Sequence, residues 1–168
     1  MIHAAKIEKA NKIIAVDVHK NKLDLAKKCG ATHVINSSKK TSINLKLKKI
    51  LDKDNLDVFI DNTGNTKIIE QGYEILSKKG RLILVGVPKI GSKVKIFTLP
   101  LHFGKQIIGS EGGSSKPDKD IITLIELTKK KKIDLKSIVS KVYSLNEINT
   151  AISDIRTGRI AGRAIIKL

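Results

Sequence analysis

The chain has 168 residues, of which 33 are Lys or Arg and 16 are Asp or Glu, giving a formal net charge of +17. Hydrophobic residues make up 40% of it, which is enough to bury a core and argues against a wholly disordered chain. No apolar run approaches the roughly 18 residues that cross a bilayer. The single cysteine, Cys29, excludes a disulfide framework and a multi-cysteine metal site. We therefore expect a globular, cytoplasmic protein.

The excess of positive charge raises the question of nucleic-acid binding. Base reading relies on bidentate arginine, and single-strand binding relies on stacked aromatic side chains. This chain has no Trp, two Tyr and three Phe, and its lysines are spread through every segment. Its arginines are few: Arg81, Arg156, Arg159 and Arg163. The composition therefore disfavours nucleic acid as the main partner.

Short apolar runs alternate with amphipathic stretches along the first two thirds of the chain. After a short helical opening at 2–7, the pattern predicts strands at 12–17, 32–35, 56–61, 81–87, 93–97 and 106–109. Between them it predicts helices at 21–29, 43–51 and 68–76. Strands that alternate with helices of this length indicate βαβ units and a parallel sheet. The prediction is a doubly wound α/β fold.

The alternation of short apolar runs and amphipathic stretches changes from Pro117 onward. A helix is predicted to begin there, since proline is tolerated in a first turn, and a strand follows at 139–143. Ser144 and Glu147 have the spacing of a capping box, which predicts a helix over 148–155. A terminal strand is expected at 161–168. We therefore expect residues 1–110 to form one domain and residues 111–168 a smaller α+β unit.

Asp17 stands at the carboxyl end of the first predicted strand. In dinucleotide-binding folds, a carboxylate there accepts hydrogen bonds from the adenosine ribose and repels a 2′-phosphate. An acid in this place can equally cap the helix that follows. The spacing alone does not decide between these two roles.

The glycine-rich loop that would support the first role is missing. The pattern G-x-G-x-x-G should lie about 20 residues before the acid, and counting back from Asp17 places it before Met1. We therefore expect the chain to begin inside the helix that such a loop would open, after the first strand of the fold.

Several segments together resemble the coenzyme domain of the medium-chain, zinc-dependent alcohol dehydrogenases. They are KIIAVD (12–17) with Lys22 and AKKCGAT (26–32), DNTG (61–64), GRLILVGVP (80–88) and GSEGG (109–113). The ending, IRTGR (155–159) and GRAII (162–166), resembles the C-terminus of that family. The order and spacing of these segments carry the resemblance nearly from end to end, and they imply the C-terminal, NAD-binding portion.

Carried over residue by residue, the resemblance implies a cofactor site for NAD. Asp17 and Lys22 would bind the adenosine ribose, and Arg163 would reach the pyrophosphate. The resemblance implies that the remaining residues contact the two ends of the cofactor. Thr63 and Gly64 would lie at the adenine, and the nicotinamide and its carboxamide would be contacted by Val85, Gly86, Val87, Ser110 and Glu111.

The resemblance places catalysis outside this chain. In the family, a zinc ion in a separate N-terminal domain polarises the alcohol, and hydride passes to the nicotinamide. This chain has no matching zinc ligands, so we expect no catalytic or metal-binding residue in it and no turnover by it alone. The alternatives are a non-catalytic Rossmann-like binding or interaction module and, less favoured, a basic nucleic-acid-associated protein.

One consequence concerns partners. Without its first strand, the sheet would have unpaired edges on the strands ending at Asp17 and Asp61. We therefore expect a homo-oligomer, or a complementing N-terminal fragment that supplies the strand, in addition to the dinucleotide; we expect no membrane partner.

Overall fold

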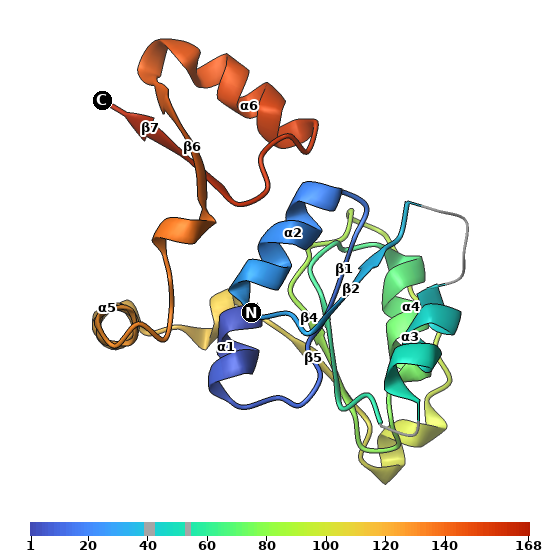
Figure 1. Ribbon diagram of the computed structural model, residues 1–168. Helices are drawn as coiled ribbons and strands as arrows, with labels where there is room; N and C mark the ends of the chain where they lie inside the picture. The colour runs from blue at the N-terminus through green and yellow to red at the C-terminus, as the bar shows by residue number, and fades with distance from the viewer. Residues whose placement is uncertain (39–42, 53–54) are drawn as a thin grey trace. The chain divides into compact units, whose positions relative to one another are not determined.

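The computed structural model describes residues 1–38, 43–52 and 55–168 (Figure 1). These residues form two compact units. One contains Met1–Ile43 and Pro117–Leu168, and the other contains Asn44–Lys116. Among the described residues, no helix is long and apolar enough to cross a membrane.

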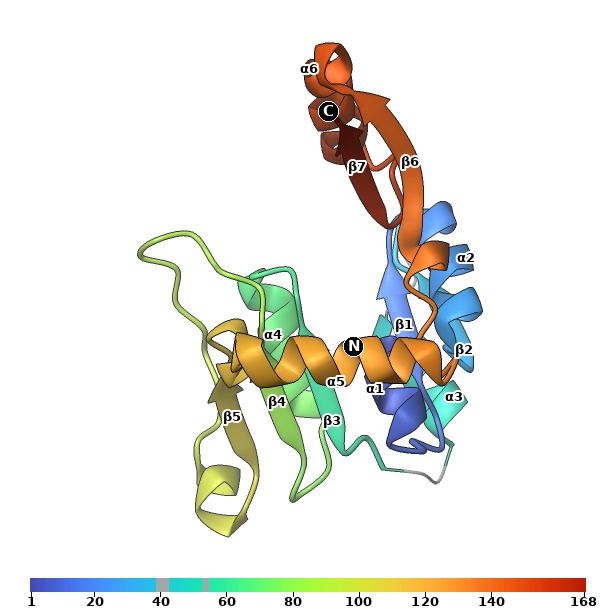
Figure 2. The same cartoon turned by 90° about the vertical axis from the view of Figure 1, so that its left-hand side faces the viewer.

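The unit of residues 44–116 is built on three parallel strands, β3 (Val58–Asp61), β4 (Arg81–Leu84) and β5 (Gln106–Gly109), in the order β3-β4-β5. Helix α4 (Thr66–Ile75) lies against one face of this sheet (Figure 2). The helix α3 (Ile43–Leu51) and the short 3-10 helices η1 (Leu99–Phe103) and η2 (Gly112–Ser114) complete this part of the chain.

The core of this unit forms where α4 meets β4. It consists of four buried residues, Ile69, Tyr73, Leu76 and Leu82, and of partly buried apolar side chains around them. Leu82 has no exposed surface at all. The three apolar residues of α4 and its following turn are spaced three or four apart, so they share one face of the helix.

The other unit contains a βαβ arrangement near the N-terminus. Helix α1 (Ile2–Ile7) precedes β1 (Ile14–Asp17), α2 (Lys20–Cys29) and β2 (His33–Asn36), and β1 pairs with β2 in parallel. Its buried cluster consists of Ile13, Ala26 and Ala31. Among the described residues of this unit, β1 and β2 form a two-stranded sheet.

The last third of the chain belongs to this same unit. It runs through α5 (Pro117–Lys129), η3 (Lys136–Ile138), β6 (Val139–Ser144), η4 (Leu145–Glu147), α6 (Ile148–Arg156) and β7 (Arg163–Lys167). Strands β6 and β7 are parallel, with α6 between them in sequence. The capping box predicted from Ser144 and Glu147 is present, and it opens η4 and then α6.

The parallel α/β fold confirms the predicted class, but the prediction of a strand at 93–97 is wrong. Two backbone groups of this segment are bound by side chains of α4 instead of by a neighbouring strand. The Lys95 N–H donates to Glu70 Oε1 at 2.7 Å, and the Phe97 carbonyl accepts from the Tyr73 hydroxyl at 2.9 Å. The segment is therefore docked on a helix and is not assigned as a strand. The predicted strand 81–87 is also shorter, since β4 ends at Leu84.

Candidate functional site

The carboxyl ends of the parallel strands carry most of the predicted site residues, as expected for an open α/β sheet. In the unit of residues 44–116, the loop after β4 folds back onto β3. The N–H groups of Val85 and Gly86 both donate to the Asp61 carbonyl, at 2.8 and 2.9 Å. Ser110, directly after β5, donates from its N–H to the Leu84 carbonyl at 2.9 Å. These contacts bring the ends of β3, β4 and β5 together.

Two glycines allow the loops after β3 and β4 to touch. Gly64 has φ +67, and a Cβ there would lie 2.6 Å from the carbonyl carbon of Val87. A Cβ on Gly86 would overlap the backbone nitrogens of Thr63 and Gly64. Backbone therefore packs directly on backbone, so Thr63, Gly64, Gly86 and Val87 form one continuous surface.

Asp61 holds this surface in place, although it was not among the residues predicted for the site. Its side chain is 1% exposed. Oδ1 accepts from the Thr63 N–H at 3.1 Å and from the Thr63 hydroxyl at 2.6 Å, and Oδ2 accepts from the Gly64 N–H at 2.9 Å. The signal that could have revealed it is an acid at the end of an apolar strand, followed by Asn-Thr-Gly.

The other predicted residues of this unit differ in their surroundings. Val87 is 89% exposed and Val85 is 40% exposed, so both present apolar surface to solvent beside the glycine contact. Ser110 is partly buried, and its hydroxyl accepts from the Gly113 N–H at 3.2 Å. Glu111 is exposed, and its carbonyl accepts from the Ser114 N–H. The structure thus keeps Ser110 at the strand ends and leaves the Glu111 side chain in solvent.

Asp17, Lys22 and Arg163 lie in the other unit. Asp17 is the last residue of β1 and is partly buried; its Oδ1 accepts from the His19 N–H at 2.9 Å. Lys22 is partly buried in the first turn of α2. Arg163 is the exposed first residue of β7. The Asp17 carboxylate therefore does take part in a turn before α2, while its Oδ2 has no hydrogen bond among the described residues.

Burial explains the shifted pKa values of two other titratable groups. Burial raises the pKa of the Cys29 thiol, which keeps it protonated and a poor nucleophile. Burial also lowers the pKa of Lys105, whose Nζ donates to the Tyr73 carbonyl at 3.0 Å and lies 4.6 Å from the Tyr73 ring centre. Within the described ranges, no group of three His, Cys, Asp or Glu could hold a metal ion.

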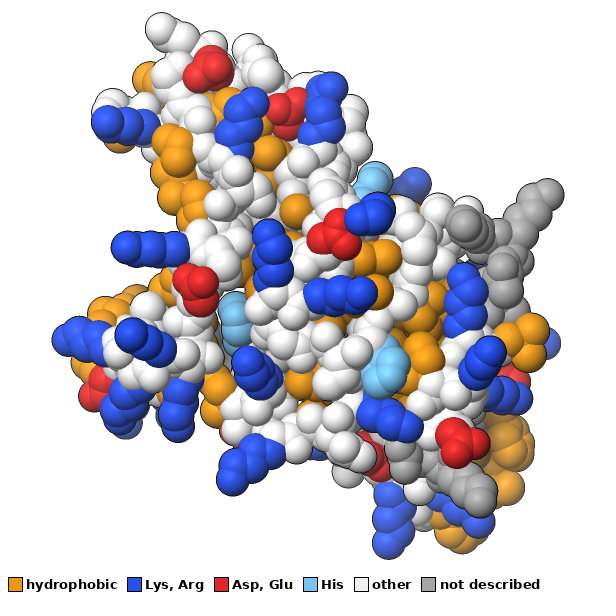
Figure 3. Space-filling model, viewed as in Figure 1, with side chains coloured by type: hydrophobic (Ala, Val, Ile, Leu, Met, Phe, Trp, Pro, Cys, Tyr) orange, Lys and Arg blue, Asp and Glu red, His pale blue; other side chains and the backbone are white. Residues whose placement is uncertain are grey.

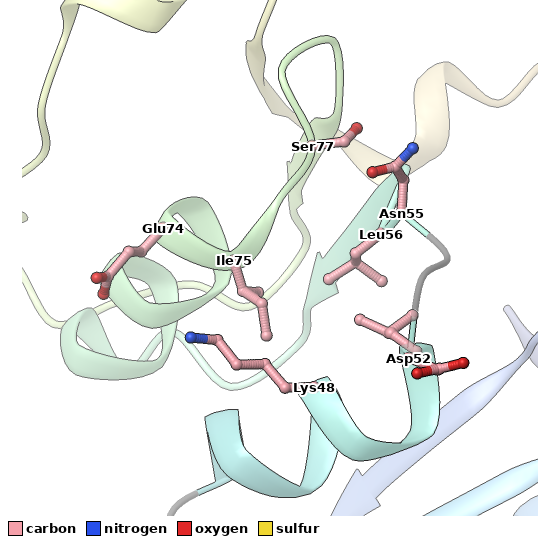
Figure 4. A pocket seen from close by; sticks show the side chains of 8 residues that line it. Lys48, Asp52, Asn55, Leu56, Glu74, Ile75 and Ser77 are labelled. Carbon is pink, nitrogen blue, oxygen red and sulfur yellow. The ribbon is translucent and has the colours of Figure 1, made fainter.

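Two hollows in the unit of residues 44–116 lie away from these strand ends. The first, of about 240 Å³, is next to the ends of α3 and α4, where the chain enters β3 (Figure 4). Its lining residues include Lys48, Asp52 and Glu74. The second, of about 400 Å³, is lined by Lys78, Leu99, Pro100 and Phe103. The predicted site residues line neither hollow.

Charge is dispersed on the face of the molecule that Figure 3 shows. Figure 3 shows Lys and Arg side chains scattered over the visible face, with Asp and Glu among them. The visible face carries no single basic stripe of the kind that a nucleic-acid backbone would follow.

Comparisons with known proteins agree on one family. A family model described as "Zinc-binding dehydrogenase" matches residues 1–130. A NAD-dependent alcohol dehydrogenase of Sulfolobus acidocaldarius is 32% identical over 99% of this chain and 46% of its own length. An S-(hydroxymethyl)glutathione dehydrogenase of Saccharomyces cerevisiae is 31% identical over 94% of this chain and 42% of its own length.

A solved structure gives the same result. Benzyl alcohol dehydrogenase from Acinetobacter calcoaceticus superposes with a TM-score of 0.89 at 36% identity, over 99% of this chain and 45% of that chain. The chain therefore spans less than half the length of these relatives. The match is consistent with their C-terminal portion.

Proposed function

Since this chain belongs to the zinc-binding dehydrogenase family, we propose that it forms the NAD-binding part of an alcohol or polyol dehydrogenase. Bound NAD would supply the hydride acceptor for oxidation of the alcohol. The observation that carries the proposal is the carboxylate of Asp17 at the carboxyl end of β1: one oxygen accepts from the His19 N–H, and the other has no hydrogen bond among the described residues. A ribose diol presents two hydroxyl donors that such an oxygen can accept.

The remaining predicted residues fit the parts of a dinucleotide chemically. The Arg163 guanidinium offers fork geometry to a pyrophosphate. The contact between Gly64 and Gly86 keeps bulky side chains away from the strand ends, so the flat rings of a dinucleotide could approach the backbone there. The exposed Val85 and Val87 offer apolar surface beside it. Thr63, Ser110 and Glu111 are proposed to bind through groups at the same edge.

We also propose that this chain alone is inactive. Zinc chemistry needs a cluster of ligands that the described residues do not provide. The alcohol-activating step is therefore assigned to the part of the relatives that this chain does not match.

We also propose a domain boundary between residues 110 and 111, as predicted from the sequence. Residues 111–168 would dock on the part of the relatives that this chain does not match. In support, β6 and β7 place Val142 opposite Ile165 in register, and the two side chains are 55% and 45% exposed. Their neighbours Tyr143 and Ile166 belong to the cluster under α6, so the exposed pair lies on the opposite face of the strands.

The outer edges of β1 and β3 are the observation that supports the proposal of a partner strand. Ile13 and Asp17 accept hydrogen bonds from β2 and its flanks through their carbonyls, so the backbone groups of Ile14 and Val16 point to the other edge. By the same alternation, Val58 and Ile60 present the outer edge of β3. We propose that these edges accept strands from a complementing N-terminal fragment or from a second copy of this chain.

The proposed cofactor is tested by titrating NADH and NADPH against the wild type, Asp17→Ala and the control Asp24→Ala. Asp24 is an exposed acid on α2, paired with Lys20, so it matches the change in charge. Absolute affinity should be weak, because the sequence has no G-x-G-x-x-G loop to bind the pyrophosphate. Wild type and Asp24→Ala should prefer NADH. In Asp17→Ala, the preference for NADH over NADPH should fall by about tenfold or more, because the free energy of a hydrogen bond to a charged group corresponds to about that factor in affinity. A wild type that prefers NADPH, or an unchanged preference in Asp17→Ala, contradicts the proposal.

A further inference from the structure

The first turn of α2 is joined to the segment that follows α6. Asn21, in that turn, donates from Nδ2 to the Gly158 carbonyl at 2.9 Å and to the Arg159 carbonyl at 3.2 Å. Residues 21 and 158 are 137 positions apart in sequence but belong to the same compact unit. One amide group therefore bridges two consecutive carbonyls in the segment after α6.

Close packing reinforces these hydrogen bonds. Gly158 is buried with φ +74, and a Cβ there would overlap the imidazole ring of His19. Further along α2, Leu25 Cδ2 lies 3.1 Å from the position of a Cβ on Gly162. We call these contacts of His19, Asn21 and Leu25 with residues 158–162 the α2 seam.

The α2 seam lies between two of the residues proposed to bind the dinucleotide. On one side, the Asp17 carboxylate binds the N–H of His19, whose ring packs on Gly158. On the other side, Gly162 donates from its N–H to Ser140 Oγ at 2.9 Å and directly precedes Arg163. The seam thus links the end of β1 to the start of β7 through a short series of direct contacts.

The chain on the far side of the seam is held to α6 and β6 by further contacts. The Arg159 side chain pairs with Asp154 at 2.7 Å (Nε to Oδ1), and the Arg159 N–H donates to the Asp154 carbonyl at 2.9 Å. Asp154 in turn accepts from the buried Tyr143 hydroxyl at 2.7 Å. Residues 158–159 are therefore anchored both to α6 and to α2.

We infer that Asn21 is a positioning residue: through the α2 seam it sets where Arg163 stands relative to Asp17, and thereby the affinity for the dinucleotide. This role rests on the proposed function. Asn21 itself is assigned no contact with the ligand. Its substitution should act on affinity through geometry.

Asn21→Asp separates this role from helix stability. The new carboxylate oxygen would face two carbonyl oxygens where an NH₂ group donated, so the seam should open. A negative charge in the first turn of a helix is at the same time favourable. The matched control is Asn149→Asp, since Asn149 is the exposed second residue of α6, as Asn21 is the second residue of α2. Asn21→Ala removes the donor without repulsion, and alanine is favoured in helices.

The experiment measures NADH affinity and the hydrogen exchange of amides 157–163 in the full chain and in the three variants. We expect Asn21→Asp to lose about tenfold in affinity and Asn21→Ala less, with faster exchange at 157–163 and little change in Tm. Asn149→Asp should match the wild type within about twofold. Equal affinities in Asn21→Asp and Asn149→Asp would overturn the inference.

The exchange data keep this result distinct from a failure of the proposed function. If the wild type binds no dinucleotide, the proposed function fails and the positioning role fails with it, whereas the exchange data still show whether the seam exists. If Asn21→Asp leaves exchange at 157–163 unchanged, the seam itself is refuted, whatever the affinity.

Discussion

Substitution of Asp61 by asparagine tests how the loop after β3 is held. The carboxylate is 1% exposed and accepts three hydrogen bonds from Thr63 and Gly64. Asparagine keeps the shape but replaces one acceptor oxygen by an NH₂ group. With Oδ1 retained toward Thr63, that NH₂ would face the Gly64 N–H, so two donors would oppose each other.

The magnitude follows from these contacts. The bond from Gly64, at 2.9 Å, is lost, and a hydrogen bond to a charged group contributes about 1.5–3 kcal/mol. The two bonds from Thr63 remain but pass from a charged to a neutral acceptor. The cheaper burial of a neutral side chain offsets part of the loss. We expect the free energy of unfolding to fall by about 3 kcal/mol, or roughly 6–12 °C in Tm for a chain of this size.

Thermal unfolding and hydrogen exchange at Thr63 and Gly64 measure this effect. Asp57→Asn is the control, because Asp57 is an exposed acid just before the same strand and loses the same charge. Asp61→Asn should unfold at a lower temperature and exchange faster at both amides. If Asp61→Asn and Asp57→Asn unfold within about 2 °C of each other, the buried Asp61 carboxylate does not stabilise the loop after β3.

Two further predictions concern the cores of the units. Leu82→Ala should lower the free energy of unfolding by about 2–5 kcal/mol in urea titrations, because Leu82 is fully buried, whereas Leu45→Ala at a 65% exposed position should have little effect. The hydrogen bond from the Tyr143 hydroxyl, together with the nearby Arg159 charge, lowers the pKa of Asp154 in the folded state. Ionised Asp154 therefore stabilises the fold at pH values above its unfolded-state pKa. This stabilisation is lost as the pH falls through the folded-state pKa. Asp154→Asn should therefore flatten the fall in stability between about pH 5 and pH 2; an unchanged slope would contradict this.

The sequence predicted the parts of the fold that depend on local pattern. Apolar β-branched runs located β1 and β3, and Asp17 is indeed the last residue of β1. The Ser144 and Glu147 pair correctly predicted a helix start. These features depend on neighbouring residues, so periodicity and capping chemistry reveal them.

The errors and omissions depend on tertiary contacts. Residues 93–97 have the composition of a strand, but α4 supplies their hydrogen-bond partners. The bridge from Asn21 to Gly158 joins positions that no local pattern connects. Asp61 was not predicted as a site residue, because an acid at the end of a strand is a weak signal until its burial and its hydrogen-bond donors are known. The roles of the predicted site residues in binding remain predictions.

The NAD-binding role proposed for this chain, as part of a larger dehydrogenase, can be tested by complementation. The most direct test mixes it with the part of the Acinetobacter calcoaceticus benzyl alcohol dehydrogenase that it does not match, and measures NADH affinity and Tm. Strands supplied to the edges of β1 and β3 should raise Tm and increase NADH affinity by about tenfold or more. A monomeric chain with a sharp, high-temperature transition and an NADH affinity that the added part leaves unchanged would contradict the account.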